Sequence, residues 1–118
     1  MSTHATARQQ NLEWIDICAA SDVVANTGVA ALVEGKQIAI FNTRAGWYAI
    51  DNHDPFSQAN VIARGIVGDI KGQLVVASPV YKQHFCLNTG QCLEDDSVAL
   101  SVYPTNISDD RVQIAIQR

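Results

Sequence analysis

The sequence has 118 residues, of which 47% are hydrophobic and 17% are charged, so it is long enough for one hydrophobic core and too short for two ordinary domains. A net charge of -4 argues against nucleic acid as a partner, because no basic surface is available for a phosphate backbone. No apolar run approaches the roughly 20 residues that cross a bilayer, and residues 1–10 lack a signal-peptide core, so we expect a cytoplasmic chain without membrane contacts.

The first half of the chain has the pattern of a β-meander. Residues 1–10 show no apolar periodicity, and we expect a mobile tail there, followed by a single domain over residues 11–118. Ser21-Asp22-Val23 favours a short helical turn, which Asn26-Thr27-Gly28 ends. Short runs of apolar or alternating residues, separated by turns that contain glycine, predict strands. These strands cover residues 12–18, 29–33, 37–41 and 47–50.

The second half continues this pattern after a glycine-rich stretch. Asn88-Thr89-Gly90 predicts a hairpin turn, because glycine adopts the left-handed backbone conformation without steric cost. Asn106-Ile107-Ser108 is interpreted as a turn. The predicted strands cover residues 73–77, 84–87, 91–93, 98–103 and 112–116, and the last two alternate most clearly. With almost no helical period, the sequence predicts an all-β sandwich or partly open barrel of antiparallel strands.

Two loops between predicted strands carry the most information about function. They read Asp51-Asn52-His53-Asp54-Pro55-Phe56 and Ser78-Pro79-Val80-Tyr81-Lys82-Gln83-His84-Phe85. This layout resembles the Rieske iron-sulfur domain, whose first loop carries Cys-x-His and whose second carries Cys-Pro-x-His-Gly-x-x-Phe, so that two thiolates and two imidazoles bind a [2Fe-2S] cluster. The resemblance implies a Rieske-like fold with these two loops at its tip.

The resemblance also implies that all four cluster ligands are lost. The ligand positions fall on Asp54, Phe56, Ser78 and Tyr81, none of which offers a thiolate or an imidazole. We therefore expect a fold with no metal, cofactor or catalytic residue of its own. Asp54 is expected to turn its loop by accepting backbone N–H groups, Phe56 to pack where imidazole edges would lie, and Tyr81 to close the remaining gap.

Residues in and near these loops also allow three other interpretations: a zinc site, a disulfide and a nucleophilic triad. His84, Cys86 and Cys92, with His53, offer zinc ligands, although their spacing matches no common zinc motif. A disulfide between Cys86 and Cys92 is a further alternative, which a reducing compartment disfavours. The default interpretation of the cysteines is that they are small buried apolar residues. Ser78, His84 and Asp54 are the residue types of a nucleophilic triad, but no strained turn positions the serine.

Four blocks make the resemblance more specific. They are residues 51–56, 64–69, 78–85 and 88–90, and together they are similar to the small subunits of assimilatory NAD(P)H-dependent nitrite reductases. This resemblance implies a cytoplasmic oxidoreductase complex of nitrate assimilation that reduces nitrite to ammonium. A large catalytic subunit would hold FAD, a [4Fe-4S] cluster and sirohaem. This chain would be an accessory subunit that carries no redox centre.

The two loops are then a candidate docking surface for the large subunit. Phe56 and Tyr81 are the candidate aromatic anchors, and Arg64, Lys82 and His84 are candidates for polar orientation, since aromatic and arginine side chains often carry interface energy. The alternative is that both aromatic rings only fill the core. Tyr81 is the better interface candidate, because its hydroxyl needs a hydrogen-bond partner.

Two other functional classes remain as alternatives. One is a Rieske-type ferredoxin that carries electrons itself, which a visible absorption spectrum would reveal. The other is a free-standing Rieske-like binding module unrelated to nitrite. Deleting the chain and restoring it, while nitrite reductase activity is followed, would distinguish that module from an accessory subunit.

Overall fold

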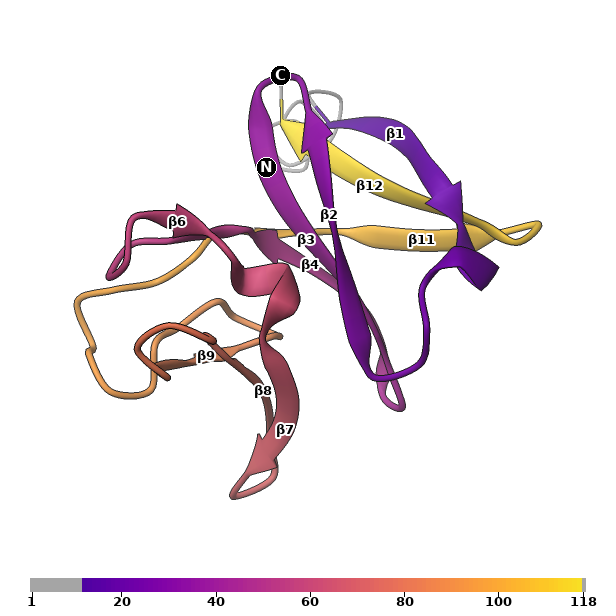
Figure 1. The fold of residues 1–118 in the computed structure, drawn as a ribbon. Helices are drawn as coiled ribbons and strands as arrows, with labels where there is room; N and C mark the ends of the chain where they lie inside the picture. The colour runs from indigo at the N-terminus through magenta and orange to yellow at the C-terminus, as the bar shows by residue number, and fades with distance from the viewer. Residues whose placement is uncertain (1–11, 118) are drawn as a thin grey trace, which may run out of the picture.

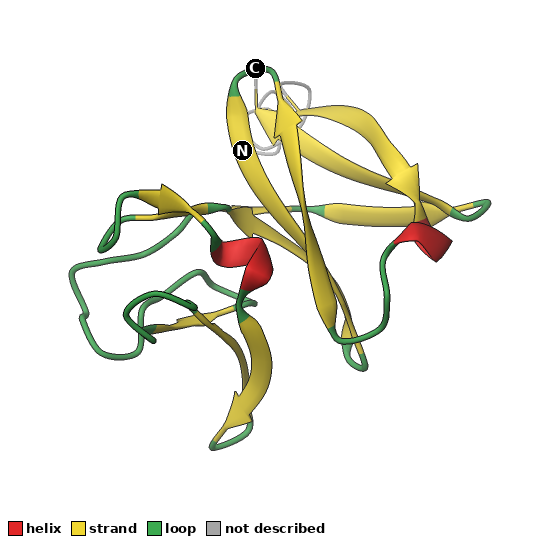
Figure 2. Cartoon of the chain, in the orientation of Figure 1, coloured by secondary structure: helices red, strands yellow, loops and turns green. Residues whose placement is uncertain are grey.

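The computed structural model describes residues 12–117, and the tail predicted at residues 1–10 lies outside this range. Strands dominate the described chain, and its only helical elements are the 3-10 turns η1 (Ala20–Asp22) and η2 (Ile62–Arg64) (Figure 2). The predicted all-β class is confirmed. The strands are β1 (Leu12–Ala19), β2 (Thr27–Val33), β3 (Lys36–Thr43), β4 (Gly46–Asp51), β5 (His53–Asp54), β6 (Ala59–Asn60), β7 (Ile66–Ile70), β8 (Gln73–Ala77), β9 (His84–Cys86), β10 (Val102–Tyr103), β11 (Thr105–Ser108) and β12 (Arg111–Gln117).

Two antiparallel sheets form a sandwich around the first of two apolar cores. One sheet has the order β10-β4-β3-β2 and the other β1-β12-β11 (Figure 1). Ile38 and Ile40 of β3 face Ile114 of β12, and all three are fully buried. Alternate residues of a strand point to opposite faces, which is why the apolar positions of β12 recur every second residue.

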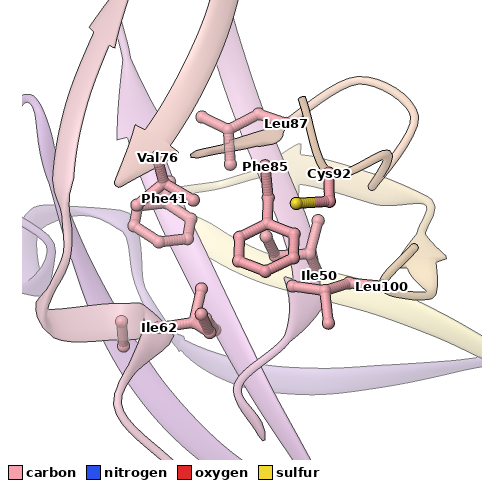
Figure 3. Close-up of a cluster of buried hydrophobic side chains, with 10 residues drawn as sticks. Phe41, Ile50, Ile62, Val76, Phe85, Leu87, Cys92 and Leu100 are labelled. Atoms are coloured by element: carbon pink, nitrogen blue, oxygen red, sulfur yellow. The ribbon is translucent and has the colours of Figure 1, made fainter. Parts of the chain in front are cut away.

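Strand β3 is buried on both faces because it also contributes to the second core. Its Ala39 and Phe41, which alternate with Ile38 and Ile40, pack against Phe85 of β9. The second core lies beneath the small sheet β7-β8-β9 and the turn η2 (Figures 1 and 3). It supports the β5-β6 hairpin and the β8-β9 connection, which contain the two loops singled out in the sequence.

The two ends of the described chain lie side by side. Leu12 at the start of β1 pairs with Gln117 at the end of β12. In Figure 1 the β1-β12 pair lies at the upper right, whereas the β5-β6 hairpin and β9 lie at the left of the view.

The prediction of one strand over residues 98–103 is largely wrong, because the chain pairs with two different segments within this range. Ala99 forms an isolated bridge with Gln91, whereas Val102 pairs with Ile50 of β4. Only residues 102–103 belong to a strand. Gly90 permits the close approach that precedes this change: its φ is +82°, and a Cβ there would collide with the carbonyl oxygen of Leu100.

Three further differences concern short elements. Residues 106–108, predicted as a turn, lie in β11, because Thr105–Ser108 pairs with β12. Residues 91–93 form only isolated bridges in place of the predicted strand. Strand β7 was not predicted, because the sequence there has only one short apolar run between glycines and was interpreted as a turn. The β5-β6 pair and η2 were not predicted either, since two-residue strands and single turns leave no period to detect. No helix within residues 12–117 is long and apolar enough to cross a membrane.

Candidate functional site

The two tip loops share the same local structure. Each begins with a polar residue followed by proline, namely Asp54-Pro55 and Ser78-Pro79. The N–H of Phe56 donates to Asp54 Oδ1 at 2.9 Å, and the N–H of Val80 faces Ser78 Oγ at 3.4 Å. In both loops the first side chain therefore turns back onto the backbone two residues later. For Asp54 this is the predicted loop-turning role.

Each loop is closed by a residue in the left-handed conformation. The N–H of Gln58 donates to the Asp54 carbonyl at 2.8 Å, and the N–H of Lys82 donates to the Ser78 carbonyl at 3.1 Å. Gln58 has φ +61° and Lys82 has φ +67°. L-residues pay a steric penalty in this region, so both loops hold a strained position four residues after their first residue.

A buried hydrogen bond joins the two loops. Ser78 Oγ donates to Asp54 Oδ2 at 2.5 Å, and both residues have no exposed surface. Burial opposes ionisation of Asp54. Hydrogen bonds from the Ser78 hydroxyl and the Phe56 amide outweigh this effect, so the pKa of Asp54 lies below its usual value of 3.8. A charged, hydrogen-bonded carboxylate thus links the two positions where the Rieske motif has cysteine.

These residues do not fit a [2Fe-2S] cluster. Asp54 and Ser78 bond to each other, and a cluster would have to stand between them. Their oxygen atoms are hard donors, whereas the cluster requires thiolate or imidazole ligands. Phe56 has no donor atom. Within residues 12–117 no group of three or more His, Cys, Asp or Glu side chains is arranged to hold a metal ion.

The two aromatic candidates occupy different environments. Phe56 is half-buried against the second core, and its ring centroid lies 6.3 Å from that of Phe85. This position agrees with packing in the place of an imidazole. Tyr81 is 60% exposed, so the expectation that it closes the gap between the loops is wrong. Its loop turns outward after Pro79 and presents the ring to solvent.

The three polar candidates also differ. Arg64 is exposed at the end of η2, and Lys82 is exposed in the second loop. His84 is partly exposed but engaged by Glu94: its Nδ1 lies 2.7 Å from Glu94 Oε2, and its backbone N–H donates to Glu94 Oε1 at 2.8 Å. These contacts lower the pKa of Glu94 against the opposing effect of burial.

The alternative zinc and disulfide sites do not form. Cys86 and Cys92 are buried and free, and Cys92 forms a β-bridge with Phe85 and not with Cys86. Cys92 Sγ faces Glu94 Oε1 at 3.7 Å, so Glu94 contacts both His84 and Cys92. The cysteines are small buried residues, as the default interpretation states.

The triad alternative fails on geometry. Ser78 donates directly to Asp54, while His84 bonds to Glu94. A triad requires the histidine between the serine and the carboxylate. No nucleophile is activated by this arrangement.

Two exposed apolar residues beside the loops were not among the site residues predicted from the sequence. Ile66 is 74% exposed and Val80 is 45% exposed. The sequence shows Ile66 only in a two-residue apolar run between glycines, which is interpreted as a turn, so no burial or exposure was predicted for it. Its neighbour Val67 is the residue that packs inward. Val80 directly follows Pro79, and an apolar residue in such a turn was the available signal.

Comparison with known proteins identifies the family. The family model for the Rieske-like [2Fe-2S] domain matches residues 13–115. The nitrite reductase (NADH) small subunit of Salmonella typhimurium is 40% identical over 104 residues, covering 86% of this chain and 96% of that protein. The solution structure of the nitrite reductase [NAD(P)H] small subunit from Erwinia carotovora has a TM-score of 0.76 at 47% identity, covering 89% of this chain and 82% of that one.

A longer protein contains a similar stretch. The nitrite reductase [NAD(P)H] large subunit of Klebsiella oxytoca is 33% identical over 105 residues, which is 89% of this chain and 11% of that protein. The match over nearly all of this chain, the all-β fold and the two tip loops agree with one another. This chain belongs to the Rieske-like domain family and, within it, to the small subunits of nitrite reductase.

Proposed function

We propose that this chain is the accessory small subunit of a cytoplasmic NAD(P)H-dependent nitrite reductase and has no redox centre of its own. The reduction of nitrite to ammonium takes place on a separate large subunit, which holds FAD, a [4Fe-4S] cluster and sirohaem. The small subunit binds the large subunit and supports its activity. No electron passes through the tip of this chain.

The observation that carries this proposal is the 40% identity over 86% of the chain to the Salmonella typhimurium small subunit. The site chemistry supports the accessory role, because an Asp54–Ser78 hydrogen bond replaces a pair of thiolates. The Klebsiella oxytoca protein supports the choice of partner, since a stretch similar to this chain is part of a large subunit there. In that protein the stretch similar to this chain and the rest of the large subunit are joined in one polypeptide.

Removing this chain is expected to abolish or strongly reduce nitrite reductase activity in a cell extract, and adding the purified chain is expected to restore it. The measurement is nitrite-dependent oxidation of NADH or NADPH. The same chain unfolded by heat serves as the control, because it has the same composition and no fold. Activity that is unaffected by deletion would refute the accessory role.

The purified chain is expected to be colourless. Its absorption should come from Trp14, Trp47 and the tyrosines, because oxygen and carbon atoms stand at all four ligand positions. The measurement is a visible spectrum of freshly prepared protein, together with analysis for iron and acid-labile sulfide. Stoichiometric iron and sulfide would contradict the proposal and favour a ferredoxin.

A further inference from the structure

Three large apolar side chains are exposed at neighbouring positions of the tip. Ile66 is 74% exposed, Tyr81 is 60% exposed and Val80 is 45% exposed. Ile66 pairs with Ala77, which is one residue before the second loop begins. The hydrogen bonds from Ser78 N to Gln83 O and from Lys82 N to Ser78 O hold that loop compact beside it. We call these three residues, with Arg64 and Lys82, the tip patch.

The face of the sheet explains why Ile66 is exposed. Directly opposed residues of an antiparallel pair point to the same side, so Ile66 shares a face with Ala77, while Val67 and Val76 face the second core. Strand β7 is the edge of its sheet, with β8 as its only hydrogen-bonded neighbour among the described strands. An exposed isoleucine beside an exposed tyrosine typifies surfaces that bind another protein.

The charges of the tip patch are positive although the chain as a whole is acidic. Neither Arg64 nor Lys82 forms an ion pair with any residue in the range 12–117. Two carboxylates of the same region are already hydrogen-bonded: Asp54 accepts from Ser78, and Glu94 faces His84. The net charge of the sequence is -4, so two free cations beside an apolar cluster are a local reversal of sign. Such a patch complements an apolar surface bordered by carboxylates.

Lys82 occupies a position where its side chain has a steric cost. Its φ is +67°, and in the Rieske motif described above this position is glycine, the residue that adopts such a backbone without strain. The N–H of Lys82 closes the loop, and a glycine N–H would close it equally well. The lysine side chain is therefore not needed to close the loop, and it is exposed and available for a contact outside the domain.

We propose that the tip patch is the surface that binds the large subunit, and that the large subunit presents an apolar hollow bordered by carboxylates. This inference rests on the proposed function, which supplies the partner. The tip patch includes Arg64, Tyr81 and Lys82, which the sequence analysis had already named as candidate interface residues. Ile66 and Val80 replace Phe56 and His84, whose side chains are engaged with the second core and with Glu94.

The first test replaces the strained lysine and compares it with a second lysine in the same conformation. Lys71 is also exposed and has φ +52°, but it lies in the β7-β8 turn, outside the tip patch. Both Lys82→Gly and Lys71→Gly remove one charge and relieve the same backbone strain, so both variants should unfold close to the wild-type temperature. Lys82→Gly is expected to weaken binding to the purified large subunit about tenfold, equivalent to ~1.4 kcal/mol, and Lys71→Gly is expected to leave it unchanged.

The second test concerns the apolar part of the patch. Ile66→Asp is compared with Leu32→Asp, since Leu32 is 69% exposed on β2, which is also an edge strand. The aspartate at position 66 would face the carboxylates of the partner and lose the apolar contact. We expect it to weaken binding by at least about tenfold, while Leu32→Asp binds like the wild type.

Binding of the intact small subunit to the large subunit is measured by titration calorimetry at two salt concentrations. The expected results are the two losses above and a weaker salt dependence for Lys82→Gly. If the wild type binds and restores activity while both tip variants bind equally well, the tip patch is refuted and the proposed function stands. If the wild type does not bind at all, both are refuted.

Discussion

Replacing Phe85 by alanine is expected to lower the free energy of unfolding by about 3–5 kcal/mol, the usual loss when a buried phenylalanine is truncated. Phe85 has no exposed surface and lies in the second core with Phe41, Ile50 and Leu100, as Figure 3 shows. Its ring connects the small sheet β7-β8-β9, which bears the second loop, to strand β3. The void left by alanine cannot close easily, because the cluster is built from residues of two sheets, the turn η2 and the segment 87–100.

Urea unfolding at neutral pH, followed by tryptophan fluorescence, measures this loss. Phe56→Ala is the matched control, because the same atoms are removed from a half-buried ring that borders the same cluster. Its loss should be roughly half as large. Equal losses for the two variants would show that the core does not converge on Phe85 as the packing indicates.

The fold was predictable where the sequence has a clear period. Residues 112–116 alternate, and Val112, Ile114 and Ile116 are buried on one face of β12. Residues 98–103 alternate equally well, but the chain there pairs first with Gln91 and then with β4. Periodicity reports which side chains share a face, and it cannot report when a strand changes its partner.

The candidate site was predictable in its chemistry and less so in its geometry. The loss of thiolate and imidazole could be read directly from Asp54, Phe56, Ser78 and Tyr81. Their different environments could not, because burial depends on contacts between distant segments. Asp54 and Ser78 are 24 residues apart, and their hydrogen bond arises only when the two loops meet. The exposure of Ile66 depends likewise on β7 being the edge of its sheet.

Replacing Asp54 by alanine is expected to lower the free energy of unfolding by about 3 kcal/mol at pH 7, because the Ser78 hydroxyl and the Phe56 N–H lose a charged acceptor inside the domain. The sign of the pH dependence follows from the lowered pKa of Asp54 in the folded chain. The carboxylate stabilises the fold fully above its unfolded value near 3.8, and this contribution is lost as the pH falls through the lower folded pKa. The difference between wild type and Asp54→Ala should therefore be constant from pH 7 to about pH 5 and shrink below 3.8.

Urea unfolding of both proteins across this pH range provides the measurement, and Ser78→Ala and the double variant complete a mutant cycle. Because one hydrogen bond joins the two side chains, the double variant should lose less stability than the sum of the single losses. Asp54→Ala should also weaken binding of the large subunit, since the second loop, which carries Tyr81 and Lys82, is fixed to the first through Ser78. Additive losses, or a stability difference that does not change with pH, would show that the Asp54 carboxylate does not hold the two loops together.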